Sequence, residues 1–127
     1  MKVLIKKDPR YPLDLKKIRQ KAKEILASFG LSDKVELSLY FIGTRKAKEL
    51  NQTYRKMDYI PEVLSFSMNE KGPDGVLRLG DLVICFPKAR DLAMKRNRMV
   101  EEIIAELLEH GIKNLVAVKL TVGFINS

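Results

Sequence analysis

The stretch MVEEIIAELLEHGIKN, residues 99–114, is the part of the sequence that decides the fold. Its apolar residues recur at steps of three and four, which predicts an amphipathic helix; they are Val100, Ile103, Ile104, Leu107 and Leu108. His110, the only histidine in the chain, continues the row through Ile103 and Leu107, so we expect it near the edge of the apolar face. A histidine placed there suits a metal ligand or a general base, although the spacing alone favours an ordinary hydrogen-bonded side chain.

Length and composition indicate one soluble domain. The chain has 127 residues, of which 46% are apolar and 31% are charged, and this is enough for one core but too little for two. A single cysteine, Cys85, excludes an internal disulfide and fits a reducing compartment. We see neither an apolar run of about 20 residues nor a signal-peptide pattern at the start. We therefore expect a cytoplasmic protein without a membrane partner.

The charge is unevenly distributed along the chain. Residues 1–60 carry 15 Lys and Arg against 7 Asp and Glu, whereas residues 61–127 carry 9 of each. Residues 86–98 hold five basic side chains and one acidic one, and the next twelve residues hold four glutamates. A basic surface beside an acidic helix suits a polyanion such as RNA, while a solvated lysine-rich surface explains the same pattern equally well.

Periodicity and turn residues predict an α+β fold, in which a small mixed β-sheet of three to four strands has helices packed on it. The expected strands are residues 2–6, 35–42, 62–68 and 79–86, with a further alternating run at residues 115–124. The expected helices are residues 15–29 after a cap at Asp14, residues 45–56, residues 88–95 and the stretch quoted above. The sequence Gly72-Pro73-Asp74-Gly75 predicts a hairpin-like connection.

Three separated motifs carry a resemblance to a known family. They are LNQTYRKMD followed by VLSF (residues 50–58 and 63–66), LGDLVI (residues 79–84) and EHG (residues 109–111). In this order and spacing they resemble the YbeY family of bacterial endoribonucleases, which act in ribosomal RNA maturation and ribosome quality control. The resemblance is strongest over residues 35–113. It implies one zinc-hydrolase-like domain over residues 1–127, with RNA and the small ribosomal subunit as partners and a metal, usually zinc, as cofactor.

The family's metal motif, H-G-x-x-H-x-x-G-x-D-H, is only partly present. Two histidines four residues apart share a helix face in that motif, and a third completes a three-nitrogen site with an open position. Here His110 takes the first ligand position, Asn114 the second and Leu120 the third, so two of the three ligands differ. Cys85 is a chemically suitable ligand, but its place in an apolar run favours a core residue. Residues 115–127 depart from the family, which fits either an altered end of the gene or a member that lost its metal.

The resemblance also implies which residues bind RNA. Arg55 matches the family's functional arginine, which contacts the phosphate near the metal and is expected to act in catalysis; a guanidinium can pair with two phosphate oxygens and stays charged. Ser65 is expected to pack or cap locally, because no activating partner is evident. The expected RNA-binding residues are Arg55, Lys56, Lys88, Arg90, Lys95 and Arg96.

Three hypotheses about function follow. The first is a single-strand-specific, metal-dependent endoribonuclease, in which Arg55 binds phosphate and His110 belongs to the metal site. The second is a non-catalytic RNA- or ribosome-binding protein on the same fold, because two metal ligands are missing. In the third, the end of the chain is not native and residues 116–124 form an exposed, aggregation-prone strand.

Overall fold

The computed structural model describes residues 1–120, with side chains described as far as residue 117. Four strands and four helices follow one another within this part of the chain. In order they are β1 (Lys2–Lys7), α1 (Leu15–Ser28), β2 (Val35–Ile42), α2 (Thr44–Arg55), β3 (Val63–Lys71), β4 (Leu77–Cys85), α3 (Phe86–Arg96) and α4 (Val100–Leu120). The predicted α+β class is confirmed, and so are the four strands and four helices expected before residue 115.

The strands form one mixed sheet in the order β1-β2-β4-β3. The pairs β1–β2 and β2–β4 are parallel, and β3 pairs antiparallel with β4. The hairpin between β3 and β4 closes at the predicted turn, where the amide of Gly75 donates to the carbonyl of Gly72 at 3.0 Å. Gly75 has φ +78°, a conformation that glycine adopts without strain. Because β3 pairs antiparallel with β4, its first residues lie beside the carboxyl end of β4.

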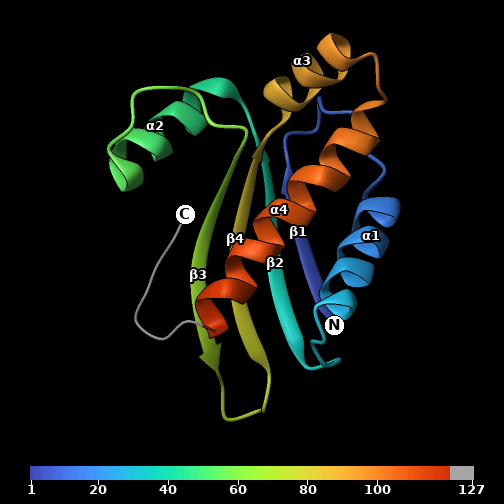
Figure 1. Ribbon diagram of the computed structural model, residues 1–127, viewed down its shortest axis with the longest axis vertical. Helices are drawn as coiled ribbons and strands as arrows, with labels where there is room; N and C mark the ends of the chain where they lie inside the picture. Colours follow the sequence, from blue (N-terminus) through green and yellow to red (C-terminus); the bar gives the residue numbers. More distant parts are fainter. Residues whose placement is uncertain (121–127) are drawn as a thin grey trace.

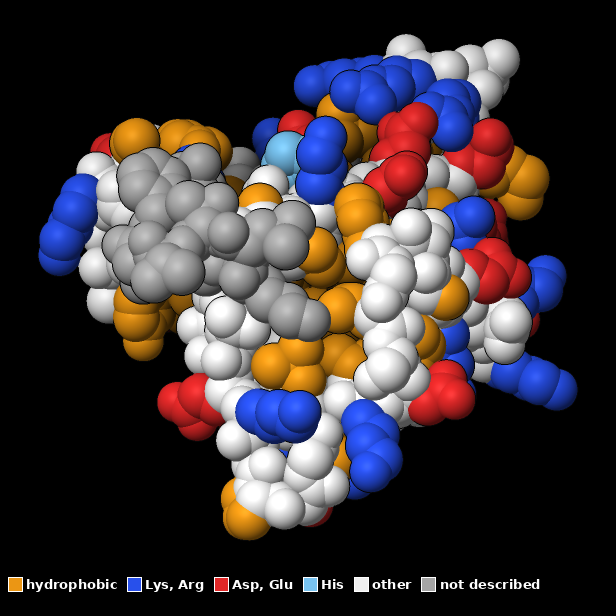
Figure 2. All heavy atoms as spheres, turned by 60° about the horizontal axis from the view of Figure 1, so that its bottom comes forward, with side chains coloured by type: hydrophobic (Ala, Val, Ile, Leu, Met, Phe, Trp, Pro, Cys, Tyr) orange, Lys and Arg blue, Asp and Glu red, His pale blue; other side chains and the backbone are white. Residues whose placement is uncertain are grey.

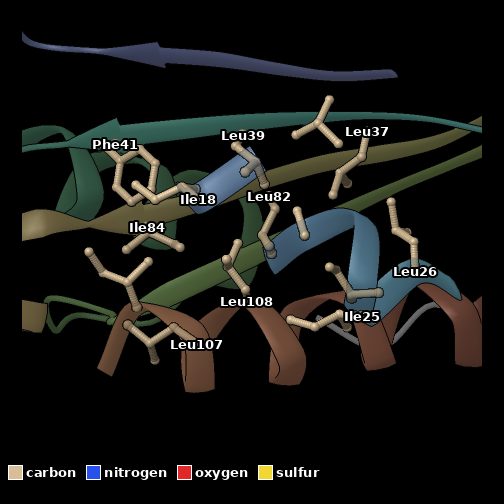
Figure 3. Close-up of a cluster of buried hydrophobic side chains, with 14 of the residues drawn as sticks. Ile18, Ile25, Leu26, Leu37, Leu39, Phe41, Leu82, Ile84, Leu107 and Leu108 are labelled. Carbon is tan, nitrogen blue, oxygen red and sulfur yellow. The ribbon is translucent and has the colours of Figure 1, made fainter. Parts of the chain in front are cut away.

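Helices α1 and α4 lie side by side over one face of the sheet, and α2 and α3 lie at the end where β2 and β4 finish (Figure 1). The core fills the space between the sheet and the α1–α4 pair (Figure 3). Figure 3 shows Ile18, Ile25 and Leu26 of α1 facing alternate residues of β2 and β4, with Leu107 and Leu108 of α4 below them. The predicted apolar face of residues 99–114 is therefore the face that covers the sheet.

The expected strand at residues 115–124 is wrong for its first half, because α4 continues to Leu120. Residues 121–124 lie outside the described part of the chain. Leu115 and Val116 are both buried, and they extend the row through Leu108 and Ile112 at helical steps of three and four. The alternating valines that suggested a strand are thus compatible with a helix face as well, and packing against the sheet selects the helix. The hypothesis of an exposed strand over residues 116–124 is therefore wrong for residues 116–120, which belong to α4.

Gly111 lies inside α4 and allows it to approach β4 closely. A Cβ atom at this position would lie 2.1 Å from Cδ1 of Leu82, so the buried Leu82 side chain would have to shift to make room for it. Glycine costs about 1 kcal/mol relative to alanine within a helix, so the close contact with the sheet accounts for its place here. None of the helices in the described residues is both long and apolar enough to cross a membrane.

Candidate functional site

A pocket of about 400 Å³ opens between α2, α3, α4 and the start of β3. Arg55, the last residue of α2, and Lys88, in the first turn of α3, contribute its basic side chains. His110 and Asn114, one turn apart on α4, line another wall. Figure 2 shows the pale-blue side chain of the single histidine at the surface, next to a basic side chain. Four residues predicted from sequence to form the site therefore line one pocket.

The fold explains why these residues meet. Strand β4 leads directly into α3 at Phe86. Pro87 fits the first turn of that helix, because the backbone N–H that proline lacks would have no partner within the helix there. Lys88 therefore stands at the carboxyl end of the sheet. Helix α2 ends at Arg55 because Lys56 adopts the left-handed conformation, with φ 58°. The chain then returns to begin β3 at the same end of the sheet. Polar side chains at the carboxyl ends of neighbouring parallel strands form binding sites in many α/β proteins.

The two basic side chains of the pocket differ from most of the charged residues around them in their ion pairing. Within the described residues, neither Arg55 nor Lys88 has an acidic oxygen at ion-pair distance. Both side chains are half-buried, and one carboxylate, Glu62, lines the same pocket. Half-buried cations without a partner are suited to bind an anion, because little competing charge has to be displaced.

The other predicted RNA-binding residues lie outside this pocket. Arg96 pairs with Glu106 at 3.5 Å, and the guanidinium of Arg90 lies over the ring of Phe86, 5.6 Å from its centroid. Lys56 caps α2 and Lys95 lies in the last turn of α3, and both are exposed. The structure thus separates the basic residues of the sequence into a pocket pair and a dispersed surface group, and the RNA-binding role of the surface group stays a prediction.

Arg96 and Arg98 form a charged corner with Glu102 and Glu106, where α3 meets α4. Arg98 contacts both glutamates, and its nitrogen lies 3.4 Å from Glu102. The hydrogen bond from Arg98 to Glu106 holds the pKa of the guanidinium above its usual value. The pKa of Glu102 is lowered, first by the backbone amide of Met99 and then by Arg98. These four charges largely neutralise one another, so the corner offers little net attraction for RNA.

The residues present do not form the metal site that the resemblance implies. The Nδ2 atom of Asn114 lies 3.5 Å from Nε2 of His110, and no group of three His, Cys, Asp or Glu side chains able to hold a metal exists among the described residues. Residues 118–127 contain none of these residue types either. Cys85 is buried, as the core interpretation expects, and burial raises the pKa of its thiol. One imidazole and one neutral amide are a poor set for a three-ligand zinc centre.

Ser65 connects the start of β3 to α4. Its buried hydroxyl donates to the carbonyl oxygen of Gly111 at 3.3 Å, across 46 residues of sequence. A hydroxyl engaged in this way holds the start of β3 against α4. This is a packing role, but its partner is distant in sequence and not local as expected.

Sequence reasoning missed the loop between α2 and β3 as a wall of the pocket. Tyr59, Ile60 and Pro61 line it together with Glu62. Asn51 fixes this loop: its side chain is fully buried, and Nδ2 donates to the carbonyl oxygen of Tyr59 at 3.0 Å. The available signal was a polar residue four positions after the buried Ala47, on the inner face of α2.

A second hollow, of about 420 Å³, lies on the face of the sheet away from α4. Tyr54 and Phe66 meet there edge to face, with ring centroids 5.2 Å apart, and Asp81 lines the same hollow. Partial burial raises the pKa of the Asp81 carboxyl. Because side chains alternate along a strand, Asp81 and Phe66 point away from the pocket that contains Arg55.

Sequence comparison places these features within a known family. The profile described as Endoribonuclease YbeY matches residues 5–116. The Endoribonuclease YbeY of Spiroplasma citri is 33% identical over 112 residues, which cover 84% of this chain and 69% of that protein. The Endoribonuclease YbeY of Aquifex aeolicus is 40% identical over 100 residues, which cover 79% of this chain and 65% of the relative.

A solved structure has the same fold. The solution structure of TM1509 from Thermotoga maritima matches 89% of this chain and 71% of its own length, with a TM-score of 0.62 and 25% sequence identity. The chain spans 48% to 69% of the length of the first curated relatives that it matches.

Proposed function

Because the chain belongs to the family described as Endoribonuclease YbeY, we propose that it is an endoribonuclease that cleaves single-stranded RNA in ribosomal RNA maturation. The proposal includes the small ribosomal subunit as the place of action and the cytoplasm as the compartment. Support comes from the curated relatives, which carry this name, and from the residues that line the pocket.

The observation that carries the proposal is the pair of basic side chains in the pocket, to which the part of the chain that the structure describes offers no acidic partner. Arg55 and Lys88 face the same cavity as His110, and the described residues supply no carboxylate at ion-pair distance to either cation. A phosphate of the RNA backbone fits this arrangement, because charge-assisted hydrogen bonds to phosphate are strongest where competing partners are absent.

The pocket residues have separate tasks in phosphodiester cleavage. Cleavage adds negative charge to the phosphate in the transition state. The planar guanidinium of Arg55 can hold two phosphate oxygens, and the ammonium group of Lys88 adds a second charge. An imidazole exchanges protons near neutral pH, so we assign to His110 proton transfer to or from a substrate oxygen.

Zinc, which the resemblance implies, does not enter these steps. The family's other two ligand positions hold Asn114 and Leu120, and a single imidazole gives little affinity for a catalytic zinc ion. We expect well below one zinc per chain by elemental analysis of the purified, folded protein. Close to one zinc per chain would show that additional ligands complete the site and would contradict this expectation.

The test is a cleavage and binding assay with a labelled single-stranded RNA. We expect the parent chain to bind and cleave the RNA, Arg55→Ala to weaken binding, and His110→Ala to bind normally but cleave slowly. Adding zinc or a chelator separates metal-dependent from metal-independent turnover. A parent chain that gives no cleavage product from single-stranded RNA under any of these conditions would refute the proposal.

A second candidate is a non-catalytic RNA-binding protein, favoured by the incomplete ligand set around His110. It uses the same Arg55 and Lys88 contacts but needs no proton transfer. The assay above distinguishes the two candidates, because this protein would bind RNA in an Arg55-dependent manner without product at any zinc concentration.

A further inference from the structure

Tyr59 is an aromatic residue next to the proposed phosphate site. It lines the same pocket as Arg55, and 47% of its surface is exposed. Its neighbours in the pocket wall are less accessible, since Ile60 is half-buried and Pro61 is buried. A large aromatic side chain left open to solvent beside basic side chains has the composition of sites that bind single-stranded nucleic acid.

The position of Tyr59 is fixed by contacts from α2. The buried side chain of Asn51 donates to the Tyr59 carbonyl at 3.0 Å, and the Asn51 carbonyl accepts from the amide of Met57 at 3.3 Å. Nearby, Nε2 of Gln52 donates to Asp58 at 2.8 Å, in an exposed position. Asn51 thus holds the loop backbone at Met57 and Tyr59, whereas the Gln52 contact to Asp58 is open to solvent and contributes little. A side chain on a backbone held in this way loses less conformational entropy on binding than one on a free loop.

Asn51 provides the buried contact to this loop. Its side chain is fully buried, and its Nδ2 atom donates to the Tyr59 carbonyl. An apolar residue at position 51 would lose this hydrogen bond, and the loop would then lose its side-chain contact from the buried face of α2.

We propose that Tyr59 stacks on an unpaired nucleobase of the nucleotide whose phosphate contacts Arg55, and that Asn51 positions Tyr59 for this contact. The inference rests on the proposed function and extends it from the phosphate to the base. Stacking needs a base that is free of its pair, and the bases of an A-form duplex do not expose their faces. Tyr59 thereby supplies a physical reason for single-strand preference, with tolerance for base identity because every base has a π-face.

The first test compares two RNA ligands of equal length, one with normal bases and one with abasic residues. We expect Tyr59→Leu to lower affinity for the base-bearing ligand about 5- to 100-fold and to leave affinity for the abasic ligand unchanged. Tyr54→Leu is the matched control, because Tyr54 is also exposed, at 65%, but lies in the hollow on the opposite face. Equal effects of Tyr59→Leu on both ligands, or none on either, would overturn the proposal.

A direct signal for stacking comes from Tyr59→Trp, since the chain contains no tryptophan. Its fluorescence should be quenched by the base-bearing ligand and unaffected by saturating abasic ligand. The same experiment with Tyr54→Trp should give no base-dependent quenching. Quenching of similar size at both positions would show that the contact is not specific to the pocket.

The positioning role of Asn51 is tested with a double-mutant cycle. Asn51→Ala should reduce the preference for the base-bearing ligand, add nothing to Tyr59→Leu, and increase hydrogen exchange at residues 57–61. Gln52→Ala, which removes the exposed contact to the same loop, should leave ligand preference unchanged. Additive effects of Asn51→Ala and Tyr59→Leu would mean that Asn51 acts only on stability.

The outcomes separate this proposal from the proposed function. Arg55-dependent binding of both ligands, with Tyr59→Leu equal to the parent, would refute the base site and leave the nuclease proposal standing. A parent chain that binds neither ligand would refute both.

Discussion

The pocket and the charged corner both contain two basic side chains, yet they differ in how the charge is used. In the pocket, Arg55 and Lys88 have no described carboxylate partner, whereas Arg96 and Arg98 at the corner are matched by Glu102 and Glu106. The corner neutralises its charge within the molecule and the pocket retains its charge for a ligand. Counting basic residues along a sequence therefore overestimates the surface available to RNA, because the count ignores intramolecular pairing.

The largest effect that tests this comparison is expected at Arg55. Arg55→Ala should lower affinity for single-stranded RNA about 10- to 100-fold, which corresponds to the loss of about 1.5–3 kcal/mol for a hydrogen bond to a charged group. Arg96→Ala, at the corner, should bind like the parent, contrary to the RNA-binding role expected for Arg96 from the sequence, because its guanidinium already pairs with Glu106. Affinity measured by fluorescence anisotropy checks both variants. A larger loss from Arg96→Ala than from Arg55→Ala would break the distinction.

The next largest effect is expected on the stability of α4, the helix that carries His110. This helix is held against β4 by close packing and not by ion pairs. Gly111→Ala should lower the free energy of unfolding by about 1–3 kcal/mol, because the new methyl group collides with Leu82. In a Leu82→Ala background the same substitution should be neutral or stabilising, since alanine favours a helix by about 1 kcal/mol over glycine. Urea denaturation of the four proteins measures this cycle. Equal effects of Gly111→Ala in both backgrounds would contradict the packing explanation.

A smaller effect is expected at Lys88, because a lysine contacts phosphate as a point charge without the two-pronged geometry of arginine. Lys88→Ala should weaken RNA binding several-fold, or about 0.5–1.5 kcal/mol. Lys95→Ala is the control, since Lys95 is an exposed lysine of the same helix outside the pocket. Similar losses from the two variants would indicate that α3 contributes only diffuse charge.

The smallest expected effect is an acid-dependent loss of stability at the corner. The pKa of Glu102 in the folded protein is lowered from its ordinary value of 4.5. Its contribution to stability is therefore fully present above pH 4.5 and is lost as the pH falls through the lowered pKa of the folded state. Glu102→Gln should reduce the acid dependence of the thermal midpoint, while Glu101→Gln, at the neighbouring exposed position, should not. An unchanged acid profile in Glu102→Gln would show that the corner contributes nothing measurable.

The sequence was sufficient to predict most of the fold, because the apolar periods of 2 and 3.6 residues are unambiguous in β2 and in the first part of α4. It was insufficient after residue 114. There the spacing of Leu115 and Val116 fits either a strand or a helix face, and only contact with the sheet decides between them. The turn at residues 72–75 was predictable because glycine there reflects a local conformation.

The site could be predicted only in part, because some of its residues stand in local sequence patterns and others are placed by contacts between distant elements. Arg55, His110 and Asn114 stand in motifs, and Lys88 follows a strand end, so their meeting could be expected from sequence and resemblance. The pairing of Arg96 with Glu106 depends on how α3 packs on α4, which no local pattern reveals. Tyr59 belongs to a loop without periodicity, and its place in the pocket follows from a hydrogen bond to Asn51 that is visible only in three dimensions.

The salt dependence of single-stranded RNA binding is the most direct test of the contrast between pocket and corner. Each phosphate contact with single-stranded RNA contributes about 0.7 to the slope of log affinity against log salt concentration. We expect the double variant Arg55→Ala/Lys88→Ala to lower this slope by about 1.4 and Arg96→Ala/Arg98→Ala to leave it unchanged. A slope that stays at the parent value in Arg55→Ala/Lys88→Ala would contradict the proposal that the pocket, and not the corner, binds the RNA backbone.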